Sequence, residues 1–132
     1  MTVRRLAWDQ GFVAASPQCV HGAVGEPVRY DAWWPGASIS AGTEEVTVRL
    51  PGVPALVLRP DGSREGIGAV FGVGGLIRGR WEWFLEPFDD GTIVNALLDL
   101  DVPGGERASS RRLHRLRVAV HRGLVGLKGA LE

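Results

Sequence analysis

The stretch Asp31-Ala-Trp-Trp-Pro-Gly36 places two adjacent tryptophans at the end of a short helix that is predicted over residues 26–34. Pro35 and Gly36 do not continue a helix, so the chain is expected to turn directly after the two indole rings. Large rigid rings at such a turn supply much apolar contact area, and at least one of them is expected to line a ligand pocket. The alternative is that the two rings plug the core, one of them shielding a helix end.

The residues before this stretch predict one strand and one further short helix. Residues 3–15 mix apolar and polar positions and run into Ser16-Pro17, where serine suits the cap of a helix and proline suits its first position. This helix is expected to end at Gly25. Cys19 on it has small and apolar neighbours, so we expect it to be packed and not to act as a nucleophile.

The residues after Gly36 predict an antiparallel meander. Apolar and polar side chains alternate from Glu45 onward, and residues typical of turns separate the runs. A turn is expected at Pro60-Asp-Gly-Ser63 and a hairpin at Asp89-Asp-Gly91. The predicted strands cover residues 45–50, 55–59, 65–73, 76–87 and 92–102.

A long helix is expected from Glu106 almost to Glu132, with one apolar stripe that lies on the sheet. Its three last glycines indicate either close backbone packing or a mobile end, since each weakens a helix by about 1 kcal/mol relative to alanine. His114 and His121 lie on one flank of this helix without a third ligand. We therefore expect no metal site and no cofactor.

Alternation in the two strongest strands divides their side chains between two faces. Trp81, Trp83 and Leu85 are expected to face inward, toward Leu98 and the other apolar residues of the partner strand. The opposite face carries Arg80, Glu82 and Asp99, which are most simply explained as cross-strand ion pairs in contact with water. The functional alternative is a buried acid/base carboxylate at Glu82 or Asp99.

Composition narrows the functional classes. A chain of 132 residues that is 45% hydrophobic suits one domain over residues 1–132 with a full core. Fifteen basic and fifteen acidic residues cancel, which argues against nucleic acid as a partner. The single cysteine favours a reducing compartment, the cytoplasm. No apolar run reaches about 18 residues, so neither a signal peptide nor a membrane span is expected.

The predicted order of elements is one strand, two short helices, an antiparallel meander and a long C-terminal helix. A chain with this order resembles the START-like superfamily, and within it the small polyketide cyclase/dehydrase-like proteins. The resemblance covers nearly the whole chain and rests on stretches that are signatures of a fold and not of catalysis. They are Ser16-Pro-Gln-Cys-Val20, Asp31-Ala-Trp-Trp-Pro-Gly36, Gly79-Arg-Trp-Glu-Trp-Phe-Leu-Glu-Pro87, Asp90-Gly-Thr92 and Gly126-Leu-Lys-Gly-Ala-Leu-Glu132.

The resemblance implies an α+β helix-grip fold, Bet v 1-like or START-like. In this fold a curved antiparallel sheet of about seven strands surrounds a long C-terminal helix, and two short helices follow the first strand. A deep cavity between the sheet and the long helix would hold an apolar or aromatic small molecule.

We therefore expect a ligand-binding domain, monomeric or homodimeric, that encloses a hydrophobic, aromatic or polyketide-like small molecule. Arg117 would anchor an anionic oxygen of the ligand, and His121 would relay a proton near neutral pH. The residues expected to line the cavity are Tyr30, Trp33, Trp34, Phe71, Trp81, Trp83, Leu98, Arg117 and His121.

Two other functions stay open at this point. The first is a polyketide aromatase/cyclase or dehydratase, in which the cavity folds a reactive chain and Arg117, His121 or Tyr30 assists proton transfer. The second is an interaction module whose cavity is filled by its own tryptophans.

Overall fold

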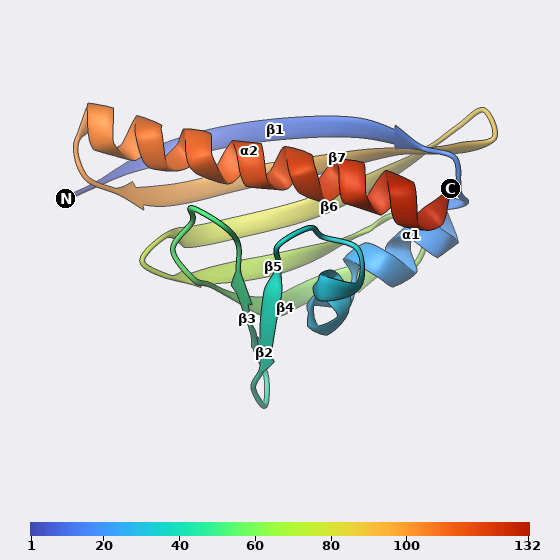
Figure 1. Cartoon of the computed structure of the whole chain (residues 1–132), viewed down its shortest axis with the longest axis horizontal. Helices are drawn as coiled ribbons and strands as arrows, with labels where there is room; N and C mark the ends of the chain where they lie inside the picture. The colour runs from blue at the N-terminus through green and yellow to red at the C-terminus, as the bar shows by residue number, and fades with distance from the viewer.

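The computed structural model describes residues 1–132 as a curved antiparallel sheet with a long helix, α2 (Glu106–Leu131), lying along its inner face (Figure 1). The seven strands follow the order β1-β7-β6-β5-β4-β3-β2, so the first and last strands of the chain are neighbours. The fold class is α+β, as predicted. The strands are β1 (Thr2–Val13), β2 (Ser38–Ala41), β3 (Val46–Arg49), β4 (Leu56–Arg64), β5 (Gly68–Gly75), β6 (Arg78–Phe88) and β7 (Gly91–Pro103).

Two short helices follow β1, as the resemblance implies: α1 (Pro17–Val24) and the 3₁₀ helix η1 (Pro27–Ala32). The Ser16 side chain accepts a hydrogen bond from the Cys19 main-chain N–H at 3.1 Å, which confirms the predicted cap. The expectation that Cys19 is packed is wrong. Helix α1 buries Val20 and Val24 instead, and Cys19, about 100° around the helix from Val20, is exposed.

Strand β4 differs from the prediction because residues 60–63 continue the strand and do not form a turn. The pairing of β4 with β5 shifts between Pro60 and Gly62, which marks a β-bulge. Proline has no N–H to donate, so it is accommodated where the ladder is already interrupted. The four-residue strand β2 also has no counterpart in the predicted strands, since Ser38–Ala41 is too short for a clear alternation.

The apolar stripe of α2 packs against the sheet, and its buried positions include Leu116, Val120 and Leu124. Close backbone packing explains two of its three last glycines. A methyl group at Gly123 would lie 2.5 Å from the Trp34 ring, and one at Gly126 would overlap the carbonyl oxygen of Trp33, whereas Gly129 has open space around it. None of the helices combines the length and the apolar character needed to span a membrane.

Candidate functional site

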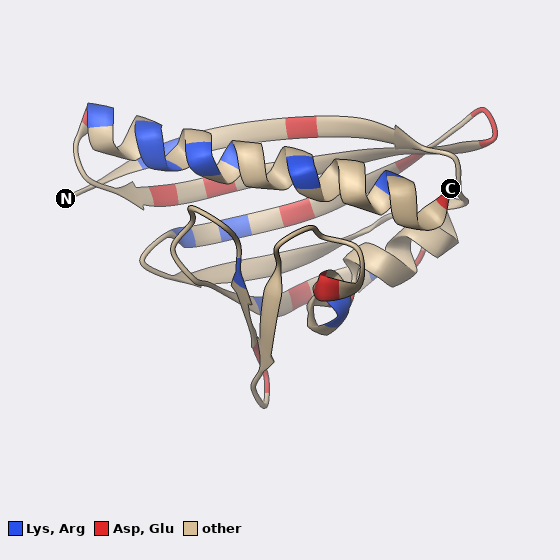
Figure 2. Ribbon diagram, in the orientation of Figure 1, with Lys and Arg blue, Asp and Glu red and all other residues tan.

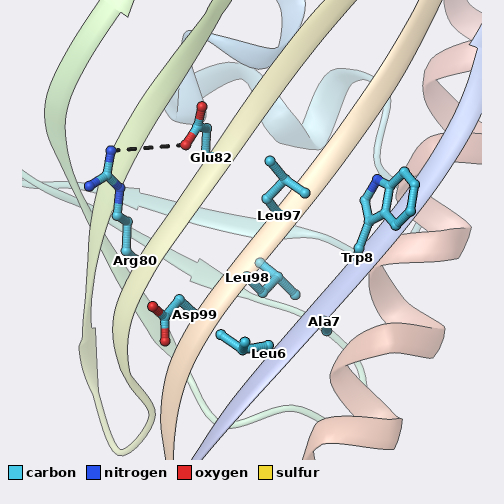
Figure 3. A pocket seen from close by; sticks show the side chains of 8 residues that line it. All are labelled: Leu6, Ala7, Trp8, Arg80, Glu82, Leu97, Leu98 and Asp99. Atoms are coloured by element: carbon cyan, nitrogen blue, oxygen red, sulfur yellow. Dashed lines mark ion pairs between the residues drawn. The ribbon is translucent and has the colours of Figure 1, made fainter.

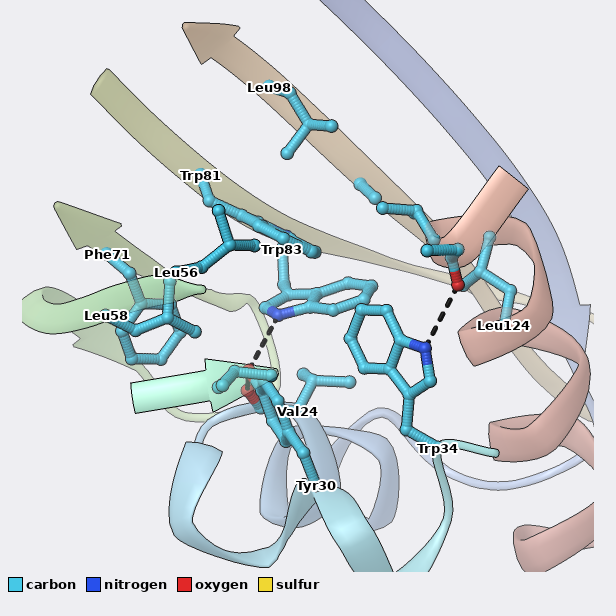
Figure 4. Packing of buried hydrophobic residues seen from close by; sticks show 14 of the residues in the cluster. Val24, Tyr30, Trp34, Leu56, Leu58, Phe71, Trp81, Trp83, Leu98 and Leu124 are labelled. Carbon is cyan, nitrogen blue, oxygen red and sulfur yellow. Dashed lines mark hydrogen bonds between the residues drawn. The ribbon is translucent and has the colours of Figure 1, made fainter. Parts of the chain in front are cut away.

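Five aromatic side chains meet between the inner face of the sheet and α2, and together they form what we call the aromatic cluster. Figure 4 labels Tyr30, Trp34, Trp81 and Trp83 of this cluster. Strand β6 contributes two of them, since its alternation turns every second residue inward, as predicted. The other three come from η1 and the link that follows it. All five are at most 8% exposed, with neighbouring ring centroids 5.0–6.4 Å apart. The members are Tyr30, Trp33, Trp34, Trp81 and Trp83.

Hydrogen bonds fix three members of the cluster. The Trp83 Nε1 donates to the Tyr30 hydroxyl at 3.0 Å, and that hydroxyl donates to the carbonyl oxygen of Val24 at 2.5 Å. The Trp34 Nε1 donates to the carbonyl oxygen of Ala119 in α2 at 3.0 Å. Burial raises the pKa of Tyr30, against a smaller opposing effect of the Trp83 hydrogen bond. The phenol is therefore neutral, and its donor and acceptor roles are both in use.

The other two tryptophans carry buried indole N–H groups without a partner. Neither Trp33 Nε1 nor Trp81 Nε1 donates a hydrogen bond. An indole nitrogen can only donate, and buried polar groups of folded proteins are almost always paired. Two unpaired donors in one apolar cluster are therefore its most distinctive chemical feature.

Phe71 and Leu98, which were also predicted to line the cavity, flank the same cluster. They lie opposite Trp81 on the two neighbouring strands, Phe71 on β5 and Leu98 on β7. Both side chains are buried, so the structure brings seven of the predicted residues into one continuous core. In this conformation the predicted lining residues pack against one another.

Arg117 and His121 lie away from this group, which corrects their expected position. Leu116 and Val120 occupy the inward positions of α2, and one further residue along a helix turns about 100° away from them. Both side chains line an open depression of about 430 Å³ on the outer flank of α2, where His121 Nδ1 is 3.3 Å from Asp9 Oδ2. No three His, Cys, Asp or Glu side chains lie close enough together to hold a metal ion.

A second pocket, of about 570 Å³, is open to solvent on the outer face of the sheet (Figure 3). Trp8 forms one wall, and its Nε1 donates to the buried Asn95 side chain at 3.0 Å. The sequence prediction missed this pocket, although Leu6 and Trp8, two residues apart on β1, are large apolar side chains that lie on the same exposed face of the strand. The pocket is lined by Leu6, Ala7, Trp8, Arg80, Glu82, Leu97, Leu98 and Asp99.

The charged residues that line this pocket form ion pairs on the outer face of the sheet. Arg80 is 3.9 Å from Glu82 on its own strand, and Asp99 accepts a bidentate hydrogen bond from Arg4 of β1. That hydrogen bond from Arg4 lowers the pKa of Asp99. Glu82 and Asp99 therefore face outward, as predicted, and neither is a carboxylic acid buried in the core. The predicted cross-strand pairing is wrong for Glu82, because its partner Arg80 lies on the same strand, β6.

Comparison with known proteins gives similarity at the level of structure. No protein-family model and no curated sequence matches the chain. A START superfamily protein from Mycobacterium smegmatis superposes with a TM-score of 0.76 at 13% identity, covering 96% of both chains. Ara h 8.0201 superposes with a TM-score of 0.72 at 10% identity, covering 98% of both chains.

The di-domain ARO/CYC StfQ from the steffimycin biosynthetic pathway is a further similar structure. It superposes with a TM-score of 0.67 at 14% identity over 98% of this chain, which spans about half of StfQ, 51% of its length. Identities this low establish shared architecture and leave activity open. Together with the sheet order and the position of α2, these similarities show that the chain has the START-like helix-grip fold.

Proposed function

We propose that this protein binds a hydrophobic small molecule, aromatic or polyketide-like, at the aromatic cluster between the sheet and α2. The similar structures, which include START-like and Bet v 1-like proteins and a polyketide ARO/CYC, are consistent with a ligand-binding fold. The observation that carries the proposal is the pair of buried, unpaired indole donors at Trp33 and Trp81.

The cluster suggests what such a ligand would look like. Flat rings would stack on indole faces, and a carbonyl or phenolic oxygen would accept a hydrogen bond from an unpaired N–H. Leaving a buried donor unpaired costs about 1–3 kcal/mol. An acceptor on the ligand that pairs this donor would therefore strengthen binding. An oxygenated polycyclic aromatic molecule combines both properties.

Entry of a ligand requires the cluster to open. The link between η1 and β2 carries Trp33 and Trp34, and only the latter indole is hydrogen-bonded to α2. Outward movement of this short link would separate the stacked pair, whose centroids are 5.4 Å apart, from the two tryptophans of β6.

We also place this binding in the cytoplasm, because the single cysteine, Cys19, is exposed and unpaired.

Binding is preferred over the aromatase/cyclase alternative on the positions of the polar residues. The Tyr30 hydroxyl already has two partners, while Arg117 and His121 lie on the outer flank of α2. A general acid or base must reach the reacting group within hydrogen-bonding distance.

The test compares anthraquinone with anthracene, which shares its ring framework but lacks the carbonyl oxygens. Trp8 is the one tryptophan outside the cluster, so Trp8→Phe leaves only cluster indoles to report binding by fluorescence. We expect saturable quenching in this variant, with anthraquinone bound about tenfold more tightly, the equivalent of one hydrogen bond. Trp33→Phe and Trp81→Phe should reduce that preference and leave anthracene binding largely unchanged.

Two outcomes would overturn the proposal. Absence of saturable quenching by either compound, together with a mass free of bound ligand for protein purified from its own host, would favour the interaction module with a filled core. Loss of quenching in Trp8→Phe, with no response from the four remaining tryptophans, would show that the ligand binds on the outer face of the sheet, beside Trp8.

A further inference from the structure

The charges of this protein are unevenly distributed, although they cancel over the whole chain. Helix α2 holds seven of the fifteen basic residues and only one of the fifteen acidic ones, Glu106. Figure 2 shows basic positions along the length of α2, whereas the acidic positions are distributed over the strands, the hairpins and η1. The balanced composition therefore conceals a strongly cationic helix.

Most of the basic residues of α2 have no anionic partner. The ion pairs that involve α2 join Glu106 to Arg5, His121 to Asp9, and Lys128 to Glu132. Arg112 donates to the carbonyl oxygen of Pro103. The remaining five form neither an ion pair nor a side-chain hydrogen bond and are exposed to solvent: Arg107, Arg111, Arg115, Arg117 and Arg122.

Three of these arginines form a stripe with two exposed valines, and we call these five residues the outer stripe. At 100° per residue they fall within an arc of about 60° that points away from the sheet. Val118 is 38% exposed and Val125 is 57% exposed. The stripe spans about 27 Å at 1.5 Å per residue. It consists of Arg107, Arg111, Val118, Arg122 and Val125.

We propose that the outer stripe docks the protein on an anionic lipid bilayer, with α2 lying in the plane of the membrane surface. Guanidinium groups bind phosphate oxygens in a bidentate manner, and exposed basic residues are attracted to anionic leaflets. Apolar side chains within a basic helical face are typical of helices that lie at the lipid interface. Val118 and Val125 favour a bilayer over a nucleic acid, because a phosphate backbone offers them no apolar contact. This proposal does not depend on the small-molecule site.

The experiment measures co-sedimentation of the full chain with vesicles of phosphatidylcholine, alone or mixed with phosphatidylglycerol. We expect binding to the anionic vesicles only, weakening as salt is added. The triple variant R107Q/R111Q/R122Q should lower the affinity for anionic vesicles at least about tenfold. The reason is that it removes three arginines, each of which is attracted to the anionic surface. The matched control R29Q/R59Q/R78Q removes the same charge from exposed positions outside α2 and should bind like the parent protein.

The variant V118S/V125S separates a bilayer from other polyanions. It should weaken vesicle binding while leaving all charges in place, and circular dichroism would verify that α2 is intact. No binding to anionic vesicles at low salt would overturn the proposal. The proposal would also be overturned by two results together: duplex DNA binding that depends on the same arginines, and vesicle binding that V118S/V125S leaves unchanged. That pattern identifies a general polyanion site.

Discussion

The Trp34 indole nitrogen lies 3.0 Å from the carbonyl oxygen of Ala119 and donates a hydrogen bond to it. Gly123, one helical turn further along α2, leaves the space in which the same ring packs. The hydrogen bond and the missing side chain together seat the link between η1 and β2 against the long helix. A residue of the candidate site, Trp34, therefore also takes part in the packing of α2 against the rest of the protein.

A methyl group at Gly123 should destabilise the protein, against the usual gain from replacing a helical glycine. Gly123→Ala would place a carbon 2.5 Å from the Trp34 ring, and overpacking of a core costs about 1–3 kcal/mol. Gly129→Ala has open space and should stabilise by about 0.5–1 kcal/mol. Urea unfolding of both variants checks this, and an equal gain for both would contradict the packing described for Trp34.

Tyr30 should resist ionisation in the folded protein. Burial raises its pKa above the ordinary value of 10.0, so folded stability should fall as pH rises above that ordinary value, because the unfolded chain then releases a proton that the folded chain retains. Tyr30 is the single tyrosine, so ultraviolet absorbance of the phenolate follows this residue alone. Phenolate should appear only together with unfolding, and smooth ionisation of the folded protein near pH 10 would contradict its burial.

Tyr30→Phe should destabilise the protein by about 1–3 kcal/mol, because it leaves the Trp83 N–H and the Val24 carbonyl without their partner. The measurement is the free energy of unfolding in urea at neutral pH. A change below a few tenths of a kcal/mol would mean that water replaces the hydroxyl.

Asn95 should stabilise the outer face of the sheet far more than the tryptophan that it holds. Its side chain accepts from Trp8 and Gln10 and donates to the Phe84 carbonyl and to Glu86. Asn95→Ala should cost about 1–3 kcal/mol. The matched control Trp8→Phe removes one of these hydrogen bonds at a side chain that is 59% exposed, so a smaller loss is expected in urea unfolding.

Glu132 should make the stability of the protein pH-dependent in acid. Hydrogen bonds from Lys128 and from the Ala14 main-chain N–H lower the pKa of Glu132 below its ordinary value of 4.5. Its contribution is therefore present above that value and is lost as pH falls through the lowered pKa. Glu132→Gln should be less stable than the parent at neutral pH, with a difference that disappears in acid. A difference independent of pH would refute the assignment.

Local patterns accounted for most of the elements. Ser16 and Pro17 predict α1 through the chemistry of the cap, and alternation predicts the inward direction of Trp81 and Trp83, because both depend on neighbours in sequence. The continuation of β4 through Pro60 was not predicted, since it depends on a bulge against β5. The exposure of Cys19 was not predicted either, because it depends on which face of α1 meets the sheet.

The sequence by itself determined the element order, the two faces of the strong strands and the presence of an aromatic-rich interior. Only the tertiary structure decided that five aromatic rings pack into one cluster, that two of their N–H groups lack acceptors, and that Arg117 and His121 lie outside it. It also decided that five arginines of α2 are left without partners, although the composition is neutral. The reason is physical: periodicity depends on residues a few positions apart, whereas packing, pairing and charge separation depend on contacts between distant parts of the chain.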